Sequence, residues 1–436
     1  MTRLSKFPFH PLLLAVYPTL TLYSYNIEEV SSSAIWRPLL ASLAGMTFFL
    51  IVLRMLLRDW FKAAFVTSFV LLLFFTYGRV YDYLKTTPLA TTNIVRHRYL
   101  AVMFAMLLGI FSWLVLKYIR DFKSVTAVLN VMAVVLLALP GYQITYDSIH
   151  TSSREKAISS WAPSTTLIST AQPKDKPDVY YIILDSYARS DILNRDLGFD
   201  NTDFIQKLEE LGFYIANCSR SNYNNTYNSL ASSLNMSYLP ELYAEAAKQN
   251  ISKDNIWMFI KPSAVRHNFE ALGYKIVTFD TGYKWTTIDD ADLYLERGLD
   301  AFGLQFTSPF EQMLMDSSVL SIYSDFRRQI NRNKFYSSDN SNANYTGLEE
   351  FILYQLPKVA EIADPTFTFA HINIPHRPYI FSTNGYLYDP VLISATDPDN
   401  VKFPIGYIYA IEYINNQMLM ILQEILDNST TPPLII

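Results

Sequence analysis

Three short polar motifs in the second half of the chain carry residue types that suit group-transfer chemistry. Asp185 follows the apolar run Val179–Leu184, which predicts a buried parallel strand. Thr226 opens a stretch with the pattern of a helix N-terminus, and His376 follows a second apolar run. A carboxylate after one strand, a hydroxyl at a helix start and an imidazole after another strand are the parts of a metal-assisted group-transfer site.

Strand and helix patterns alternate around these motifs. The expected strands are Val179–Leu184, Tyr274–Phe279, Thr366–His371 and Leu434–Ile436, and the expected helices are Thr202–Leu211, Thr226–Asn235, Ser263–Leu272 and Tyr407–Leu426. This alternation predicts an α/β domain with a mostly parallel central sheet and helices on both faces. Sites in such sheets lie beyond the carboxyl ends of the strands, where we expect Asp185, Asp280 and His371.

The N-terminal third of the chain has a different character. Five apolar stretches, each near the ~20 residues that span a bilayer, occur at Phe9–Tyr25, Pro38–Leu57, Ala63–Tyr77, Tyr99–Tyr118 and Val125–Tyr142. The alternative, buried helices of a soluble bundle, requires regular polar faces that these stretches lack. Five such stretches in a row predict a transmembrane helical domain rather than a signal peptide.

The short loops predict how these spans are oriented. Basic residues gather before the first span (Arg3 and Lys6), at Arg54–Lys62 and at Lys117–Lys123, and such clusters face the cytoplasm. The basic residues in Arg79–Arg98 break the pattern, because that loop is expected outside. We therefore predict a multi-pass protein of the cell membrane whose C-terminal domain is extracytoplasmic.

Composition supports this division of the chain. Of 436 residues, 50% are hydrophobic and 17% charged, against roughly 25% charged in an average soluble domain. We expect a transmembrane domain at 1–145, a Ser/Thr-rich linker at 146–177 and an extracytoplasmic α/β domain at 178–436. The formal charge of −5 predicts no nucleic-acid partner. Cys218 is the sole cysteine, which excludes an internal disulfide, and we expect it to be a buried apolar filler.

The order and spacing of three strings resemble the sulfatase and alkaline phosphatase superfamily, especially its membrane-anchored branches similar to lipoteichoic acid synthases and phosphoethanolamine transferases. The resemblance covers about Asp178 to Ile436, and an N-terminal five-span block is typical of those branches. The strings are Val179-Tyr-Tyr-Ile-Ile-Leu-Asp-Ser-Tyr-Ala-Arg189, Asn222-Tyr-Asn-Asn-Thr-Tyr-Asn-Ser-Leu-Ala-Ser-Ser-Leu-Asn235 and Phe369-Ala-His-Ile-Asn-Ile-Pro-His-Arg-Pro378.

The resemblance implies roles for individual residues. Asp185 corresponds to the first metal ligand, although Ser186 stands where sulfatases often have a second acid. Thr226 corresponds to the nucleophile and a further metal ligand. Because a threonine cannot become the aldehyde that sulfatases form from a cysteine, phosphoryl transfer is favoured over sulfate-ester hydrolysis.

The substrate side of the expected site is made of His376, which resembles the histidine that contacts the transferred group, together with His371 and Arg189 as candidate phosphate ligands. Each residue has a plainer alternative. Asp185 would cap a turn, Thr226 would be an ordinary helix N-cap, the histidines would be structural, and the arginine would be a solvated surface residue.

The resemblance also implies a metal shell completed by an Asp-His-Gly motif after the strand that begins at Pro433. The sequence ends at Ile436, so we expect a C-terminally truncated chain, inactive in this form, or a protein with an incomplete site. One divalent ion is expected, and a carboxylate, a hydroxyl and an imidazole suit Mn²⁺, Mg²⁺, Zn²⁺ or Ca²⁺.

The leading functional prediction is a membrane-anchored, metal-dependent phosphotransferase with a threonine nucleophile. Its partners would be membrane lipids and a lipid-linked or cell-envelope polymer phosphodiester. Two alternatives remain open at this point. One is a hydrolase of the same fold, either a phosphodiesterase or a sulfuric ester hydrolase. The other is a non-catalytic membrane protein with a degenerate sulfatase-like domain.

Overall fold

The computed structural model describes residues 7–27, 29–91, 95–159, 161, 176–296, 308–326, 348–377, 379–383, 385–386 and 402–436. The chain forms two compact units. The first, here called the helical unit, comprises Met1–Thr151 and Thr307–Asn331, and the second, the sheet unit, comprises Ser152–Phe306 and Arg332–Ile436.

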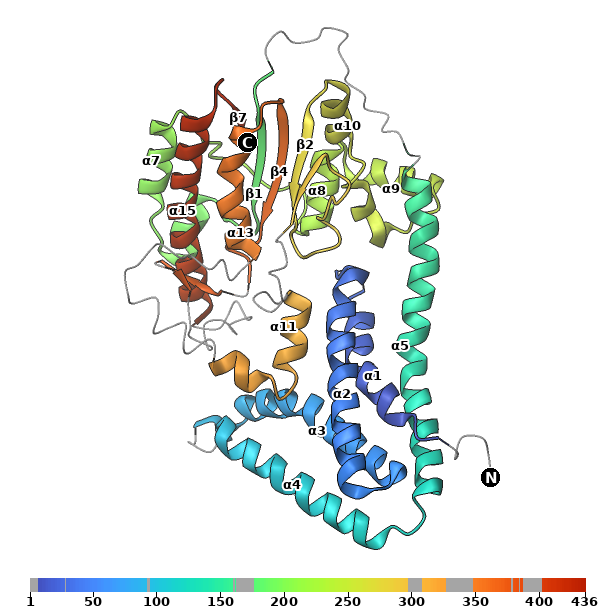
Figure 1. Cartoon of the computed structure of the whole chain (residues 1–436). Helices are drawn as coiled ribbons and strands as arrows, with labels where there is room; N and C mark the ends of the chain where they lie inside the picture. Colours follow the sequence, from blue (N-terminus) through green and yellow to red (C-terminus); the bar gives the residue numbers. More distant parts are fainter. Residues whose placement is uncertain are drawn as a thin grey trace. The chain divides into compact units, whose positions relative to one another are not determined.

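The helical unit contains five long helices (Figure 1), and four of its helical stretches are long and apolar enough to cross a membrane. The helices are α1 (His10–Tyr25), α2 (Trp36–Leu57), α3 (Trp60–Thr86), α4 (His97–Tyr118) and α5 (Phe122–Ser159), with short 3-10 turns at Ser32–Ile35 and Pro88–Thr91. The four candidate spans are Ser32–Leu57, Trp60–Thr86, His97–Tyr118 and Phe122–Ser152. Large apolar side chains cover their outer surfaces, as expected of helices that face lipid.

The expected first span is a helix, but a short one. At 16 residues α1 extends about 24 Å at 1.5 Å per residue, less than the ~30 Å of a hydrocarbon core. Its Ala15 packs in one cluster with Met46 of α2 and Leu71 of α3. His10 at its start is buried, and its Nδ1 lies 2.6 Å from the Ser68 hydroxyl. Of the five predicted spans, four form helices long and apolar enough to cross a membrane within the described residues, and α1 does not reach that length.

The expected linker is shorter than predicted, because α5 continues to Ser159. The Ser/Thr-rich sequence that indicated a tether is helical here. The Thr145 hydroxyl donates to the Gly141 carbonyl oxygen, and the Ser148 hydroxyl donates to the Ile144 carbonyl oxygen. Both hydroxyl groups are therefore hydrogen-bonded within the helix. Residues 162–175 of the expected linker lie outside the described part of the chain.

A second boundary also differs from the prediction. Residues 308–326 were expected in the outer α/β domain, yet they belong to the helical unit. The helix α11 (Pro309–Asp316) begins with a capping box between Ser308 and Glu311. Its Phe310 is fully buried in the cluster that contains Tyr23, Val30 and Ile35. No helix was predicted at these residues, and the contacts of Phe310 are what assign the segment to the helical unit.

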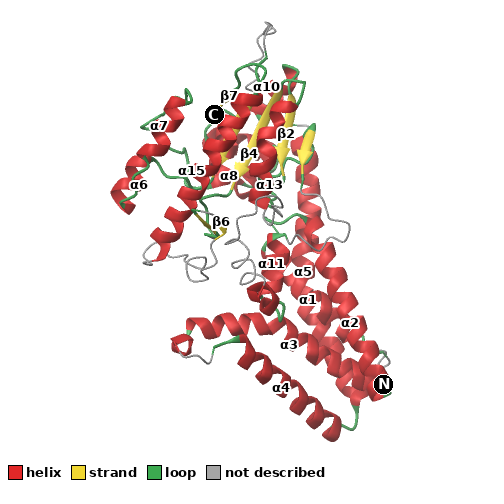
Figure 2. Ribbon diagram, turned by 60° about the vertical axis from the view of Figure 1, so that its left-hand side comes forward, coloured by secondary structure: helices red, strands yellow, loops and turns green. Residues whose placement is uncertain are grey.

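The sheet unit is built on a five-stranded sheet whose strands are all parallel, which confirms the predicted parallel sheet, although β3 was not among the predicted strands. Its strands are β1 (Val179–Leu184), β2 (Lys275–Phe279), β3 (Leu293–Leu295), β4 (Thr366–Ile372) and β7 (Leu434–Ile435), in the spatial order β3-β2-β4-β1-β7. Figure 1 labels β7, β1, β4 and β2 across this sheet, and Figure 2 shows β4 and β2 as neighbouring yellow strands. A two-residue antiparallel pair, β5 (Phe381–Ser382) with β6 (Gly385–Tyr386), stands apart from this sheet.

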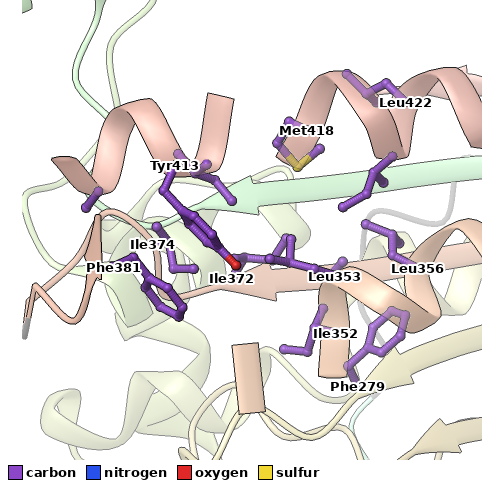
Figure 3. Close-up of a cluster of buried hydrophobic side chains, with 14 of the residues drawn as sticks. Phe279, Ile352, Leu353, Leu356, Ile372, Ile374, Phe381, Tyr413, Met418 and Leu422 are labelled. Carbon is purple, nitrogen blue, oxygen red and sulfur yellow. The ribbon is translucent and has the colours of Figure 1, made fainter. Parts of the chain in front are cut away.

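Helices cover both faces of the sheet because successive strand residues point to opposite sides. Phe367 and Phe369 of β4 pack in one core with α8 (Thr226–Leu234) and α9 (Leu239–Lys248). Ala370 and Ile372 of the same strand pack in the other core. Figure 3 shows part of this second core, where Ile352, Leu353 and Leu356 lie near Ile372, and Met418 and Leu422 come from a long helix. The remaining helical elements of the sheet unit are α6 (Ser190–Leu197), α7 (Thr202–Glu210), α10 (Ala264–Ala271), α13 (Leu348–Gln355), α15 (Lys402–Asn428) and 3-10 turns at Lys253–Phe259 and Leu356–Glu361.

The membrane orientation of the sheet unit can be tested directly. A reporter that is active only outside the cytoplasm, fused after Ala171, should give full signal, because basic residues retain loops in the cytoplasm and the basic clusters place this point outside. A matched fusion after Arg120, in the loop between α4 and α5, should be silent. Activity of a cytoplasm-only reporter at Ala171 would contradict the orientation.

Candidate functional site

The predicted carboxylate and one of the histidines meet at the carboxyl ends of neighbouring strands. Strands β1 and β4 are parallel, with Ile183 opposite His371, and the Asp185 backbone N–H donates to the Ile372 carbonyl oxygen at 2.9 Å. Asp185 lies two residues after Ile183, so both Asp185 and His371 fall on the same face of the sheet. Helix α8 packs in the core on that face.

Thr226 reaches this carboxylate from the start of α8. Its hydroxyl lies 3.1 Å from Asp185 Oδ2 and 3.3 Å from Oδ1, in position to donate to the carboxylate. The helix N-cap is Asn225, and Thr226 is the first residue within the helix. The alternative that Thr226 is an ordinary N-cap is therefore wrong, because its hydroxyl contacts Asp185 and not the N–H groups of its own helix.

His371 is the most constrained member of the group. Its side chain is fully buried, and its Nε2 lies 3.4 Å from Asp185 Oδ2. Neither ring nitrogen has a hydrogen-bond partner of good geometry. A buried polar atom without a partner lowers the stability of the fold by roughly 1–3 kcal/mol. The His371 Nε2 is therefore suited to bind a ligand that approaches beside the Asp185 carboxylate. The Trp285 ring packs edge-on at 6.2 Å and holds the imidazole in place.

The local charge keeps Asp185 ionised. Burial raises the pKa of its carboxyl group, but the neighbouring His371 and His376 imidazoles and the hydrogen bond from the Thr226 hydroxyl outweigh burial and lower the pKa below its ordinary value. The turn after Asp185 is fixed by Tyr407, whose hydroxyl donates to the Ser186 carbonyl oxygen at 2.6 Å. Ser186 itself has a positive φ of 67°.

His376 lies on the loop after β4, and its charge is one cause of the lowered pKa of Asp185. It is partly exposed, and its Nδ1 lies 2.7 Å from the Arg377 carbonyl oxygen. Among the described residues, no hydrogen bond of the His376 Nε2 is found, so this atom can contact a substrate.

Two further candidates have other roles. The Arg189 guanidinium forms a bidentate ion pair with Asp191 and donates to the Ser219 carbonyl oxygen, so its donors are engaged away from the Asp185 carboxylate. Asp280 accepts a hydrogen bond from the Gly282 N–H and shapes the turn after β2. Cys218, expected to be a buried filler, is exposed.

The sequence did not indicate Glu349, an acid at the start of α13. Its Oε2 accepts the Asn373 backbone N–H at 3.1 Å, two residues beyond His371. Burial raises the pKa of Glu349 to about 7, and the negative charge of Asp185 adds to the effect, while hydrogen bonds from Asn373 oppose it. Two acids at a helix start are common for helix-dipole reasons, so nothing local distinguished this one.

The raised pKa predicts a pH-dependent stability that Glu349→Gln should remove. The protonated acid is favoured in the folded protein, so its contribution is full below the ordinary glutamate pKa of about 4.3 and is lost as pH rises through about 7. In EDTA, the apparent Tm of the wild type should fall more between about pH 5 and about pH 8 than that of Glu349→Gln. Glu424→Gln, an exposed acid on α15, should match the wild type; equal pH slopes for all three proteins would contradict the assignment.

The donors gathered at this edge of the sheet fit a divalent ion in kind. The Thr226 hydroxyl and the His371 Nε2, which has no hydrogen-bond partner, lie 3.1 Å and 3.4 Å from Asp185 Oδ2. Oxygen and imidazole donors suit Mn²⁺ or Zn²⁺. Within the described residues, no three His, Cys, Asp or Glu side chains are grouped to hold a metal, so the set consists of one acid, one hydroxyl and one imidazole.

Comparisons with protein families, with curated protein sequences and with solved structures gave no significant match to this chain.

Proposed function

We propose that this protein is a membrane-anchored phosphotransferase of the sulfatase and alkaline phosphatase superfamily, acting on lipid-linked or envelope-polymer phosphodiesters. The observation that carries the proposal is the Thr226 hydroxyl at 3.1 Å from the Asp185 carboxylate, beside the buried and unsatisfied Nε2 of His371. A hydroxyl held against an ionised acid at the carboxyl edge of a parallel sheet is placed as a nucleophile would be.

In the proposed reaction the Thr226 oxygen attacks the phosphorus of a phosphodiester. The new bond joins Thr226 Oγ1 to phosphorus, the bond from phosphorus to the first alcohol breaks, and that alcohol leaves with the proton that Thr226 gives up. Before the attack, the Thr226 hydroxyl donates a hydrogen bond to the Asp185 carboxylate, which orients the Thr226 oxygen. An acceptor hydroxyl then attacks the same phosphorus and restores Thr226, so that one phosphodiester is exchanged for another.

The remaining side chains position this centre. Asp185, Thr226 and His371 would hold the metal ion. When bound, such an ion lowers the pKa of a coordinated hydroxyl and neutralises charge on the phosphoryl oxygens. His376, on the partly exposed loop after β4, is the proposed donor to a phosphoryl oxygen. Tyr407 fixes the turn that carries Ser186 and thereby the direction of Asp185.

The direct test is to trap the covalent intermediate. The protein, expressed as its gene encodes it and purified in detergent, is incubated with Mn²⁺ and a fluorescent phosphatidylglycerol, quenched in acid and digested. Mass spectrometry should find a phosphoglyceryl adduct on the peptide that contains Thr226, and Thr226→Ala should lack it. Turnover with an adduct on another residue would reject the assignment. Absence of Mn²⁺ binding, adduct and turnover together would favour the non-catalytic alternative, and release of product only to water would favour the hydrolase.

A further inference from the structure

Residues 308–326, here called the docked segment, form an integral part of the helical unit. Phe310 is fully buried beside Tyr23 and Ile35. The Val319 backbone N–H donates to the Phe74 carbonyl oxygen of α3 at 2.9 Å. At Gly78 the approach is so close that an added Cβ would lie 1.9 Å from the Asp316 carbonyl oxygen. Side-chain packing, a backbone hydrogen bond and a required glycine all fix the segment to these helices.

The docking position coincides with the boundary between apolar and charged sequence in the helices. Helix α3 is almost entirely apolar from Phe65 to Tyr77 and then carries charged residues at Arg79, Asp82 and Lys85. The docked segment contacts α3 between Phe74 and Gly78, where this change occurs. Such a change marks the level at which a membrane helix passes from hydrocarbon to the headgroup region.

Two acids of the segment, Glu311 and Asp325, pair with groups on the helices. Asp325 Oδ2 lies 2.8 Å from His97 Nε2 and 4.0 Å from the Lys85 ammonium group. His97 in turn stacks on the Tyr81 ring at 3.8 Å. At the other end of the segment, Glu311 pairs with Arg37 at 3.3 Å. These ion pairs direct the acids of the segment toward the helix ends.

In residues 318–326, Val319 and Ile322 pack partly buried against the helices, but small polar side chains are buried and three large apolar side chains are exposed. Ser318, Ser321 and Ser324 are buried, and these small side chains allow close backbone approach. Leu320, Tyr323 and Phe326 are exposed by 42%, 53% and 58%. Each set repeats at a spacing of three, so each forms one side of a helical turn. Serines packed inward with leucine and aromatic residues outward suit an apolar surrounding rather than water.

We propose that the docked segment is an interfacial membrane element whose Leu320, Tyr323 and Phe326 insert among the lipids at the boundary between headgroups and acyl chains. The lipid is the occupant that fits the outward apolar residues, the inward acids and the level on α3, and aromatic side chains favour this depth. Since the chain passes from β3 to this segment and on to α13, the sheet unit is tied to the membrane surface by a second anchor besides α5. The inference does not depend on any chemistry at Thr226.

The test measures how deeply each position lies in a bilayer. In a Cys218→Ser background, single variants Leu320→Cys, Tyr323→Cys and Phe326→Cys are spin-labelled and reconstituted into phosphatidylcholine–phosphatidylglycerol vesicles. Electron paramagnetic resonance then compares relaxation by oxygen, which concentrates in lipid, with relaxation by a water-soluble nickel chelate. All three labels should favour oxygen. The control Tyr214→Cys, an exposed aromatic of the sheet unit at 91%, should favour nickel.

Two results would overturn the proposal. Nickel accessibility at positions 320, 323 and 326 equal to that of position 214 would place the segment in water. Low accessibility to both reagents would mean that protein, either the sheet unit or a second copy, covers this surface. Because the three replaced side chains are exposed, their removal leaves the core intact, and any one variant that fails to fold leaves two positions to decide.

Discussion

Thr226→Ala is expected to reduce phosphodiester turnover by roughly 10³-fold or more while the protein remains folded. The reason is that the covalent route requires an oxygen nucleophile, and the Thr226 hydroxyl is the oxygen held at 3.1 Å from Asp185. Thr226→Ser keeps a hydroxyl at the same helix position and should retain measurable turnover. Rates are measured with Mn²⁺ and a fluorescent phosphatidylglycerol, and folding is followed by the apparent Tm.

A matched control separates loss of a nucleophile from loss of a helix-start hydroxyl. Ser263 is the N-cap of α10, and its side chain accepts the Arg266 N–H. Ser263→Ala should cost about 1 kcal/mol of stability and leave turnover nearly unchanged. If Thr226→Ala behaved in the same way as Ser263→Ala, Thr226 would be structural and the proposed reaction would be wrong.

Asp185→Asn is expected to have the second large effect, on metal binding as well as on turnover. The substitution keeps the shape of the side chain but removes the charge that faces the Thr226 hydroxyl and His371 Nε2. Mn²⁺ affinity, measured by titration followed by electron paramagnetic resonance, should fall by more than about 100-fold, because even residues that only support a ligand contribute 10–100-fold. Turnover should fall with it.

The control for this prediction is Asp280→Asn. Asp280 also follows a strand of the same sheet, but its carboxylate accepts the Gly282 N–H in a turn. It should leave Mn²⁺ affinity and turnover within a few-fold of wild type, as expected for a residue outside the site. Unchanged Mn²⁺ affinity in Asp185→Asn would show that the ion binds elsewhere.

The sequence by itself determined where the chain changes from apolar helices to a parallel α/β sheet, and which polar residues follow the strands. Local hydrophobic patterns indicate these features, because a strand buried on both faces is apolar throughout its length. Two parallel neighbours then bring their carboxyl ends to one edge, so the approach of Asp185 to Thr226 and His371 followed from the predicted elements. The identity of the reaction does not follow from geometry alone and stays a prediction.

The tertiary structure decided what packs against what. Local pattern did not distinguish Glu349 from other acids at helix starts, and only the folded chain brings its carboxylate to the backbone N–H of Asn373, two residues beyond His371. The folded chain also pairs the Arg189 guanidinium with Asp191, although an arginine after a strand suggested a phosphate ligand. Pairings between residues far apart in sequence depend on the packing of whole elements, which a single sequence does not specify.

The same limit explains the two altered boundaries. Serine and threonine are compatible with both a tether and a helix, and side-chain bonds such as that of Ser148 to the Ile144 carbonyl oxygen settle the choice within α5. For residues 308–326 the sequence predicted neither the helix α11 nor the surface on which it packs. Because the hydrophobic effect is non-directional, only the contacts of Phe310, Val319 and Asp325 assigned that segment to the helical unit.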